Sequence, residues 1–214
     1  MTPAVALTWS CLACVAALLW AERAGWRGGR VLFKLGASSC FVAVALALGA
    51  TGSGYGRWLL AALLLGWLGD AALLSRQSRA FLAGLGAFLL SHLCFALAFL
   101  GGPLSATAIG VGTAAAVAFG AGVRRWLGPH LTAGFRWPVR AYVAVILLMC
   151  VTAAGHAAAT GRWAVLAGAL LFALSDLAVA RDRFVHASFA NKLWGWPTYF
   201  GAQLMLAWTV AGAA

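Results

Sequence analysis

The chain has 214 residues, of which 64% are hydrophobic and only 9% are charged. Soluble domains average about half apolar residues and about a quarter charged residues, so this composition excludes an ordinary soluble domain and indicates a membrane protein. The formal net charge of +11 comes from short basic clusters between apolar segments, which argues against a nucleic-acid-binding surface.

Eight apolar segments have the length of membrane-spanning helices. A span needs about 20 mostly apolar residues, and the segments that fit are 3–21, 31–49, 57–75, 80–101, 103–122, 138–158, 162–180 and 194–213. The first lacks the positive leader of a signal peptide, so we interpret it as a span. The sequence therefore predicts an all-α integral membrane protein, a single bundle of about eight transmembrane helices over residues 1–214.

Basic residues are distributed unequally between the two sides of this predicted bundle. Thirteen of the 15 Lys and Arg residues fall on the side of the first, third, fifth and seventh connections; Arg76 and Arg79 are two of them. Only Arg57 and Arg162 fall on the other side. The positive-inside rule places the basic side in the cytoplasm and both termini outside, and we expect the inner (plasma) membrane of a bacterium.

Two of the four acidic residues lie inside apolar segments. Asp70 lies in "GWLGDAALLSR" and Asp176 in the similar stretch "FALSDLAVAR", each near the cytoplasmic end of its predicted helix. A parallel duplication of four plus four spans and chance both explain this similarity. An unpaired carboxylate is costly in an apolar medium, so intramembrane aspartates are functional candidates. Pairing with a loop arginine, such as Arg76 or Arg181, is the structural alternative.

Further polar residues fall at nearly the same depth. Residues four apart share a helix face, so Tyr199 points with Gln203, and Lys34 points with Ser38 and Arg30. His92 lies nearer the middle of its helix. A core histidine and an interfacial tyrosine are the structural alternatives for His92 and Tyr199. The candidate site therefore comprises Asp70 and Asp176 as catalytic residues, with Arg30, Lys34, His92, Tyr199 and Gln203 around the substrate.

This set of residues suits acid-catalysed cleavage. Two carboxylates that face one low-dielectric cavity repel each other, so one can hold a proton while the other stays ionised. A neighbouring Lys34 or Arg30 suits a phosphate at the membrane surface. The five cysteines lie in apolar segments, and we interpret them as small apolar residues. We expect no metal and no cofactor.

Four segments also resemble the YhhN membrane family, which includes the lysoplasmalogenases. They are "LGDAALL", "FLAGLGAFLLSHLCFALAF", "GALLFALSDLAVARDRF" and "PTYFGAQLMLAW", and the resemblance covers at least residues 30 to 208. The chain departs from the family where Lys34 is followed by Leu35 instead of the frequent proline.

The resemblance implies hydrolysis of the vinyl-ether bond of lysoplasmalogen, a lysophospholipid within the bilayer. The products are a fatty aldehyde and glycerophosphoethanolamine or glycerophosphocholine. One of Asp70 and Asp176 would then donate a proton to carbon while the other stabilises the cation, and the residues do not tell which. Lys34 would hold the phosphate, while His92, Tyr199 and Gln203 position substrate or water.

Other classes of membrane protein also use intramembrane aspartates. A proton-coupled transporter needs a polar path across the bilayer, and the outer half offers few polar residues beyond His156. An intramembrane aspartyl protease would carry Tyr-Asp and Gly-x-Gly-Asp, where this chain has "WLGD" and "LSD". A zinc hydrolase needs about three ligands, and one histidine with two aspartates supplies them only nominally. A non-catalytic lipid-binding protein is the remaining alternative.

Overall fold

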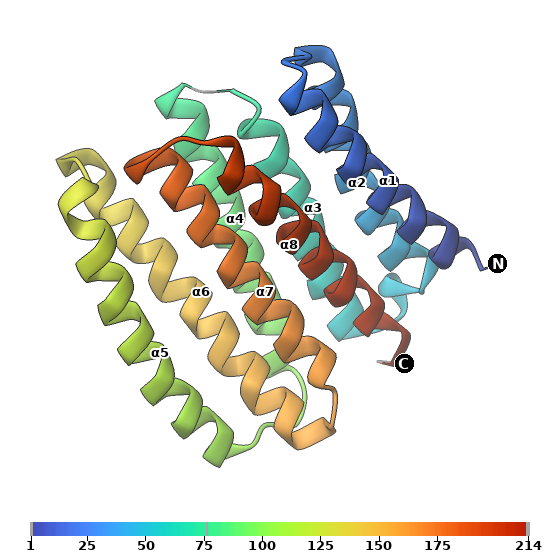
Figure 1. The fold of residues 1–214 in the computed structure, drawn as a ribbon. Coiled ribbons are helices and arrows are strands. Elements are labelled where there is room, and N and C mark those ends of the chain that lie inside the picture. Colours follow the sequence, from blue (N-terminus) through green and yellow to red (C-terminus); the bar gives the residue numbers. More distant parts are fainter. Residues whose placement is uncertain (1, 76, 213–214) are drawn as a thin grey trace.

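The computed structural model describes residues 2–75 and 77–212, and helices form nearly all of them (Figure 1). The long helices are α1 (Pro3–Arg23), α2 (Arg27–Ala47), α3 (Gly54–Ala72), α4 (Ser78–Leu100), α5 (Ala106–Leu127), α6 (Ala133–Thr160), α7 (Trp163–Ala180) and α8 (Phe189–Trp208). Short helical turns occupy Ala50–Gly52, Gly128–His130, Arg181–Val185 and Thr209–Gly212. Strands are absent from the described residues, and Arg76 and position 213 of the predicted last span lie outside them.

The helices run alternately up and down the bundle (Figure 1). Most successive helices pack against each other, but α4 packs on α3 and α6 rather than on α5. The pairs α1 with α2, α3 with α4 and α7 with α8 make the most extensive contacts. Helix α8 also contacts α1, α2 and α3, and therefore joins the two halves of the chain. Helix α5 packs mainly against α6 and lies at one edge of the bundle.

Six of these helices, all within the described residues, are long and apolar enough to cross a membrane: α1, α2, α4, α5, α6 and α7. They indicate a multi-pass membrane protein. The other two, α3 and α8, are 19 and 20 residues long. They carry much of the buried polar chemistry, including Asp70, Asn191 and Gln203, which lowers their hydropathy. The eight-span count and the four-plus-four repeat stay predictions.

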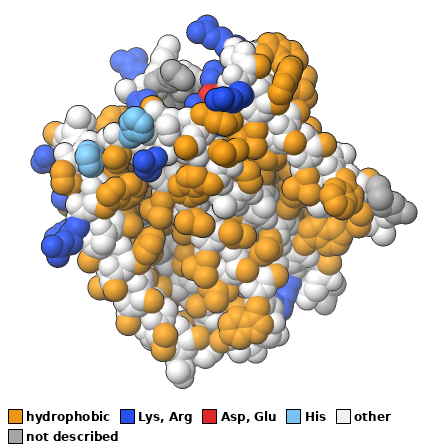
Figure 2. Space-filling view, in the orientation of Figure 1, with side chains coloured by type: hydrophobic (Ala, Val, Ile, Leu, Met, Phe, Trp, Pro, Cys, Tyr) orange, Lys and Arg blue, Asp and Glu red, His pale blue; other side chains and the backbone are white. Residues whose placement is uncertain are grey.

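Side-chain distribution matches a lipid environment. Large apolar side chains cover the outside of the bundle, and Lys and Arg gather at the end of the α1–α2, α3–α4, α5–α6 and α7–α8 connections, here called the basic end (Figure 2). Inside, close helix contacts depend on glycine. A Cβ at Gly69 would lie 2.6 Å from the Phe88 ring, and one at Gly195 would lie 2.5 Å from the Ala178 Cβ.

Helices α6 and α8 begin five residues before the predicted spans, with Pro138 and Pro197 inside them. Polar residues and aromatic contacts at the basic end hold these first turns. The Phe135 ring packs on Phe184 with centroids 5.3 Å apart. The Asn191 side chain donates to the Asp182 carboxylate at 3.0 Å. A search of the sequence for apolar segments leaves these first turns out, because they lie at the membrane boundary and carry polar residues.

Candidate active site

Asp70, in the last turn of α3, is buried within a set of polar partners. Its Oδ1 lies 3.1 Å from Lys34 Nζ, which also donates to the Asp70 backbone carbonyl at 3.3 Å. Its Oδ2 accepts hydrogen bonds from Ser38 Oγ at 2.6 Å and from Tyr199 OH at 2.7 Å. One ammonium and two hydroxyl groups thus replace the water that burial removes, which is how a buried charge is tolerated.

Helical spacing places these partners. Lys34 and Ser38 lie one turn apart on α2, as Tyr199 and Gln203 do on α8, so each pair faces α3. Gln203 Nε2 donates to Tyr199 OH at 3.1 Å. Gly66 makes room for this amide, because a Cβ there would lie 2.6 Å from Gln203 Nε2. The α3 glycine therefore fixes how α8 presents Tyr199 to Asp70.

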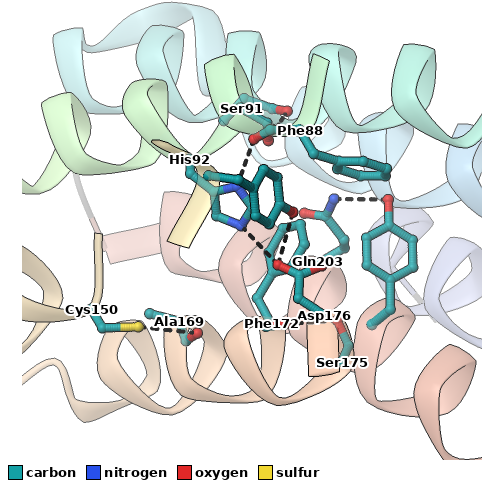
Figure 3. A network of polar contacts seen from close by, with 12 residues as sticks. Phe88, Ser91, His92, Cys150, Ala169, Phe172, Ser175, Asp176 and Gln203 are labelled. Carbon is teal, nitrogen blue, oxygen red and sulfur yellow. Dashed lines mark hydrogen bonds and ion pairs between the residues drawn. The ribbon is translucent and has the colours of Figure 1, made fainter. Parts of the chain in front are cut away.

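Asp176, in α7, has a different environment (Figure 3). Its Oδ2 accepts a hydrogen bond from Tyr142 OH at 2.8 Å and lies 3.6 Å from His92 Nε2. The other ring nitrogen, His92 Nδ1, lies 2.6 Å from the Phe88 carbonyl oxygen, so Nδ1 must carry a proton. Within the described residues, Nε2 has no hydrogen-bond partner and faces the Asp176 carboxyl group.

The two carboxyl groups therefore differ in charge environment. Asp70 pairs with an ammonium group, whereas the polar neighbours of Asp176 are a phenol and an imidazole. One proton on the His92–Asp176 pair gives each member a favourable contact: a protonated Asp176 faces a neutral ring, or an imidazolium faces a carboxylate. The Asp176 side chain is 18% exposed and that of Asp70 only 3%. Asp176 is thus the more accessible carboxyl group.

Both aspartates line one cavity of about 120 Å³, here called the aspartate cavity. Its other polar lining includes Lys34, Tyr142 and Tyr199, and its walls are apolar side chains from α3 to α8. A second cavity of about 390 Å³, the basic cavity, lies toward the basic end. Its charged lining consists of Arg30, Lys34, Arg183, Lys192, Glu22 and Asp182.

The two cavities adjoin each other. Six residues line both: Lys34, Leu73, Phe81, Val179, Gly195 and Trp196. The aspartate cavity is mainly apolar, and the basic cavity carries four cations against two carboxylates. Together they form an amphipathic site, and the shared residues Leu73 and Val179 each lie about one helical turn beyond Asp70 and Asp176.

The residues predicted around the substrate fall into two groups. Lys34 and Tyr199 line the aspartate cavity, and Arg30 lines the basic cavity, where it pairs with Glu22 at 3.5 Å. His92 and Gln203 are fully buried behind Asp176 and Tyr199 and are absent from the lining of either cavity. The predicted residues therefore lie close together, and His92 and Gln203 lie directly behind the residues that line the cavities.

Sequence reasoning missed Tyr142. Its only signal is a tyrosine near the basic end of an apolar segment, which resembles an ordinary interfacial aromatic. Ser38 was placed on the face of Lys34 but was not assigned to the site. Among the described residues, Asp70 pairs with Lys34, and Arg181 donates to Asn191 at 2.5 Å. The alternative pairing with Arg76 lies outside the described residues.

Metal ligands do not cluster at this site. Within residues 2–75 and 77–212, no three His, Cys, Asp or Glu side chains lie close enough together to hold a metal ion.

Comparisons with known proteins agree on one family. The chain is 37% identical over 155 residues to a lysoplasmalogenase of Mycobacterium tuberculosis, covering 70% of this chain and 59% of that protein. It is 33% identical over 147 residues to lysoplasmalogenase TMEM86A of Bos taurus, covering 65% and 59%. The chain thus spans about three fifths of the length of these curated relatives.

No solved structure is significantly similar to this fold. The family model of the YhhN family matches residues 29–210, which include every predicted site residue but not Glu22 of the basic cavity. The chain therefore belongs to the YhhN family.

Proposed function

We propose that this protein hydrolyses the vinyl-ether bond of a lysoplasmalogen. The products are a fatty aldehyde and glycerophosphoethanolamine or glycerophosphocholine. The observation that carries the proposal is the amphipathic site, in which a basic cavity and an apolar cavity meet beside two carboxyl groups of unlike environment. The names of the relatives support the same activity.

The basic cavity suits the phosphate of the headgroup. Its charged lining comprises four cations and two carboxylates; Lys192 and Arg30 share Glu22, at 2.5 and 3.5 Å, and Lys34 is paired with Asp70. A phosphodiester would join this network by accepting charge-assisted hydrogen bonds from its ammonium and guanidinium groups. Lys34 lines both cavities and therefore connects the phosphate position to Asp70. A lysolipid held this way has its ether oxygen near the aspartates and its chain among apolar side chains.

Asp176 is the proton donor in this proposal. In this proposal His92 Nε2 and the Asp176 carboxyl group share one proton; the pair has no neighbouring ammonium group and borders the cavity through the more exposed carboxyl group. In the first step, this proton adds to the vinyl-ether carbon that is not bonded to oxygen. The carbon bonded to oxygen becomes an oxocarbenium ion, and the pair is left one proton short.

Asp70 stabilises the cation in this proposal. Its carboxylate lies on the same cavity and its orientation is set by Lys34, Ser38 and Tyr199. Water then adds to the oxocarbenium carbon and returns a proton to the His92–Asp176 pair, which gives a hemiacetal. The hemiacetal breaks its bond to the glycerol oxygen and yields the aldehyde and the alcohol. One water is consumed and no net proton is used.

His92 and Gln203 act through their neighbours in this proposal. His92 orients and shares a proton with Asp176, and Gln203 orients the Tyr199 hydroxyl that binds Asp70. They are positioning residues, because neither lines the cavities. We also propose that the basic end lies in the cytoplasm, so that the enzyme draws its substrate from the cytoplasmic leaflet.

The test of the activity is aldehyde release by the purified protein from an alkenyl lysophospholipid. The control substrate is the matching alkyl ether, which lacks the double bond that accepts the proton. We expect aldehyde from the alkenyl lipid alone. Release from neither substrate by folded protein, or equal cleavage of both, would contradict the proposal.

A further inference from the structure

Helix α5 is attached to the bundle differently from its neighbours. It packs mainly along α6, and Leu127 in its last turn is its only buried residue. A groove of about 450 Å³ remains between α5, α6 and α7, here called the α5 groove. Its lining consists of apolar and small residues from the three helices, including Ala116 from α5, Leu147 from α6, and Leu166 and Leu170 from α7.

The α5 groove adjoins the aspartate cavity. Four residues line both: Phe119, Leu147, Ala173 and Leu177. From there the groove leads away from the basic end, since its lining on α7 continues from Leu177 back to Leu166. Those positions span roughly 16 Å at about 1.5 Å per residue, which is about half of a bilayer core of about 30 Å.

We propose that the α5 groove binds the single hydrocarbon chain of the lysolipid substrate, which reaches it laterally from the membrane between α5 and α7. This inference rests on the function proposed above. A lipid with its phosphate in the basic cavity and its ether bond beside Asp176 must direct its chain away from the basic end. The α5 groove begins at that point, runs in that direction, and presents an apolar wall.

The first test fills the groove. Ala116→Trp places an indole among the lining residues, and Ala118→Trp, on the exposed face of the same helix and absent from the groove lining, is the matched control. With a hexadecenyl substrate, we expect Ala116→Trp to lower kcat/KM by about tenfold, the effect of excluding about two methylene groups from an apolar site. With an octenyl substrate, we expect no change, and Ala118→Trp should match the wild type on both.

An unchanged chain-length profile for Ala116→Trp would overturn the proposal. Leu170→Trp, on the α7 wall, repeats the test from the opposite side if the first variant does not fold, as judged by size-exclusion chromatography. A variant that alters the oligomeric state while keeping the wild-type chain profile would assign the groove to a second copy of this chain and overturn the proposal as well.

The second test does not depend on turnover. An alkyl-ether lysophospholipid with a photoreactive group at the chain terminus is crosslinked to the wild-type protein, and the adduct is located by mass spectrometry. We expect adducts on the groove-lining residues of α5, α6 and α7 that an unlabelled alkyl-ether lysolipid displaces and a diacyl phospholipid does not. Adducts elsewhere, or equal displacement by both lipids, would overturn the chain site. Aldehyde release by the wild type separately decides the proposed function.

Discussion

The Tyr142 hydroxyl is the closest hydrogen-bond donor to Asp176, the proposed acid. It donates to Asp176 at 2.8 Å, and its ring packs against His92 with centroids 5.3 Å apart. We expect Tyr142→Phe to lower kcat by about tenfold to a hundredfold with KM nearly unchanged, because a hydrogen bond to an ionisable group is lost while the ring packing remains.

The matched control for Tyr142→Phe is Tyr55→Phe. That hydroxyl bonds to Thr209 Oγ1 at 2.6 Å, at the end of the bundle away from the basic cavity. It should leave kcat at the wild-type value. Equal kcat for both variants, measured by aldehyde release, would remove Tyr142 from the mechanism.

We expect the buried Lys34–Asp70 pair to contribute to the stability of the folded protein. Both members of the Lys34–Asp70 pair are buried, so Lys34→Met leaves an uncompensated carboxylate and should cost about 3–5 kcal/mol of unfolding free energy. Adding Asp70→Asn to Lys34→Met removes that charge and should restore much of the thermal stability without activity. Thermal unfolding of the purified proteins measures this. A single Lys34→Met variant as stable as the wild type would show that the pair is not needed for folding.

Gly66 in α3 lies where this helix packs closely against α8. Leucine is a better helix former than glycine by about 1 kcal/mol, so intrinsic propensity predicts that Gly66→Leu stabilises the protein. The contact with Gln203 predicts the opposite, because the new Cβ would lie 2.6 Å from Nε2. We expect Gly66→Leu to lower both the unfolding temperature and the activity.

Gly110→Leu is the control within another long helix. A Cβ at Gly110 in α5 meets no atom within 4 Å, so it should be tolerated. If Gly66→Leu unfolds at the same temperature as Gly110→Leu and retains its activity, Gly66 does not set the position of Gln203 and Tyr199.

Helix spacing also explains how much of the site the sequence could predict. The one-turn pairs Lys34–Ser38 and Tyr199–Gln203 follow from periodicity and depth, and the structure places them together around Asp70. Tyr142 was not predictable, since periodicity within α6 does not say which helix lies beside it. The same limit applies to the partner of each aspartate. Lateral order in a bundle depends on packing between distant segments, such as α8 against α2 and α3.

Charge distribution acts at the scale of the whole molecule. The Lys and Arg side chains gather at the basic end (Figure 2), and we propose that this end faces the cytoplasm. Thr132, before α6, is exposed at the basic end, and Thr51, before α3, is exposed at the opposite end. In intact cells, we expect a membrane-impermeant thiol reagent to label Thr51→Cys and not Thr132→Cys.

The wild-type protein, whose five cysteines lie in apolar helices, gives the background for that labelling. Both variants should react once the membrane is permeabilised. Labelling of Thr132→Cys in intact cells would reverse the orientation and place the basic cavity outside.

In the proposed mechanism, two carboxyl groups of unlike environment cleave a vinyl ether. The most direct test of this mechanism is the rate of aldehyde release from an alkenyl lysophospholipid by the wild type, Asp176→Asn and Asp70→Asn, each confirmed to be folded. The account predicts that either substitution lowers kcat by at least about a hundredfold, because each removes a group that acts on the reacting atoms. Near-normal turnover by either variant would contradict the two-carboxylate mechanism.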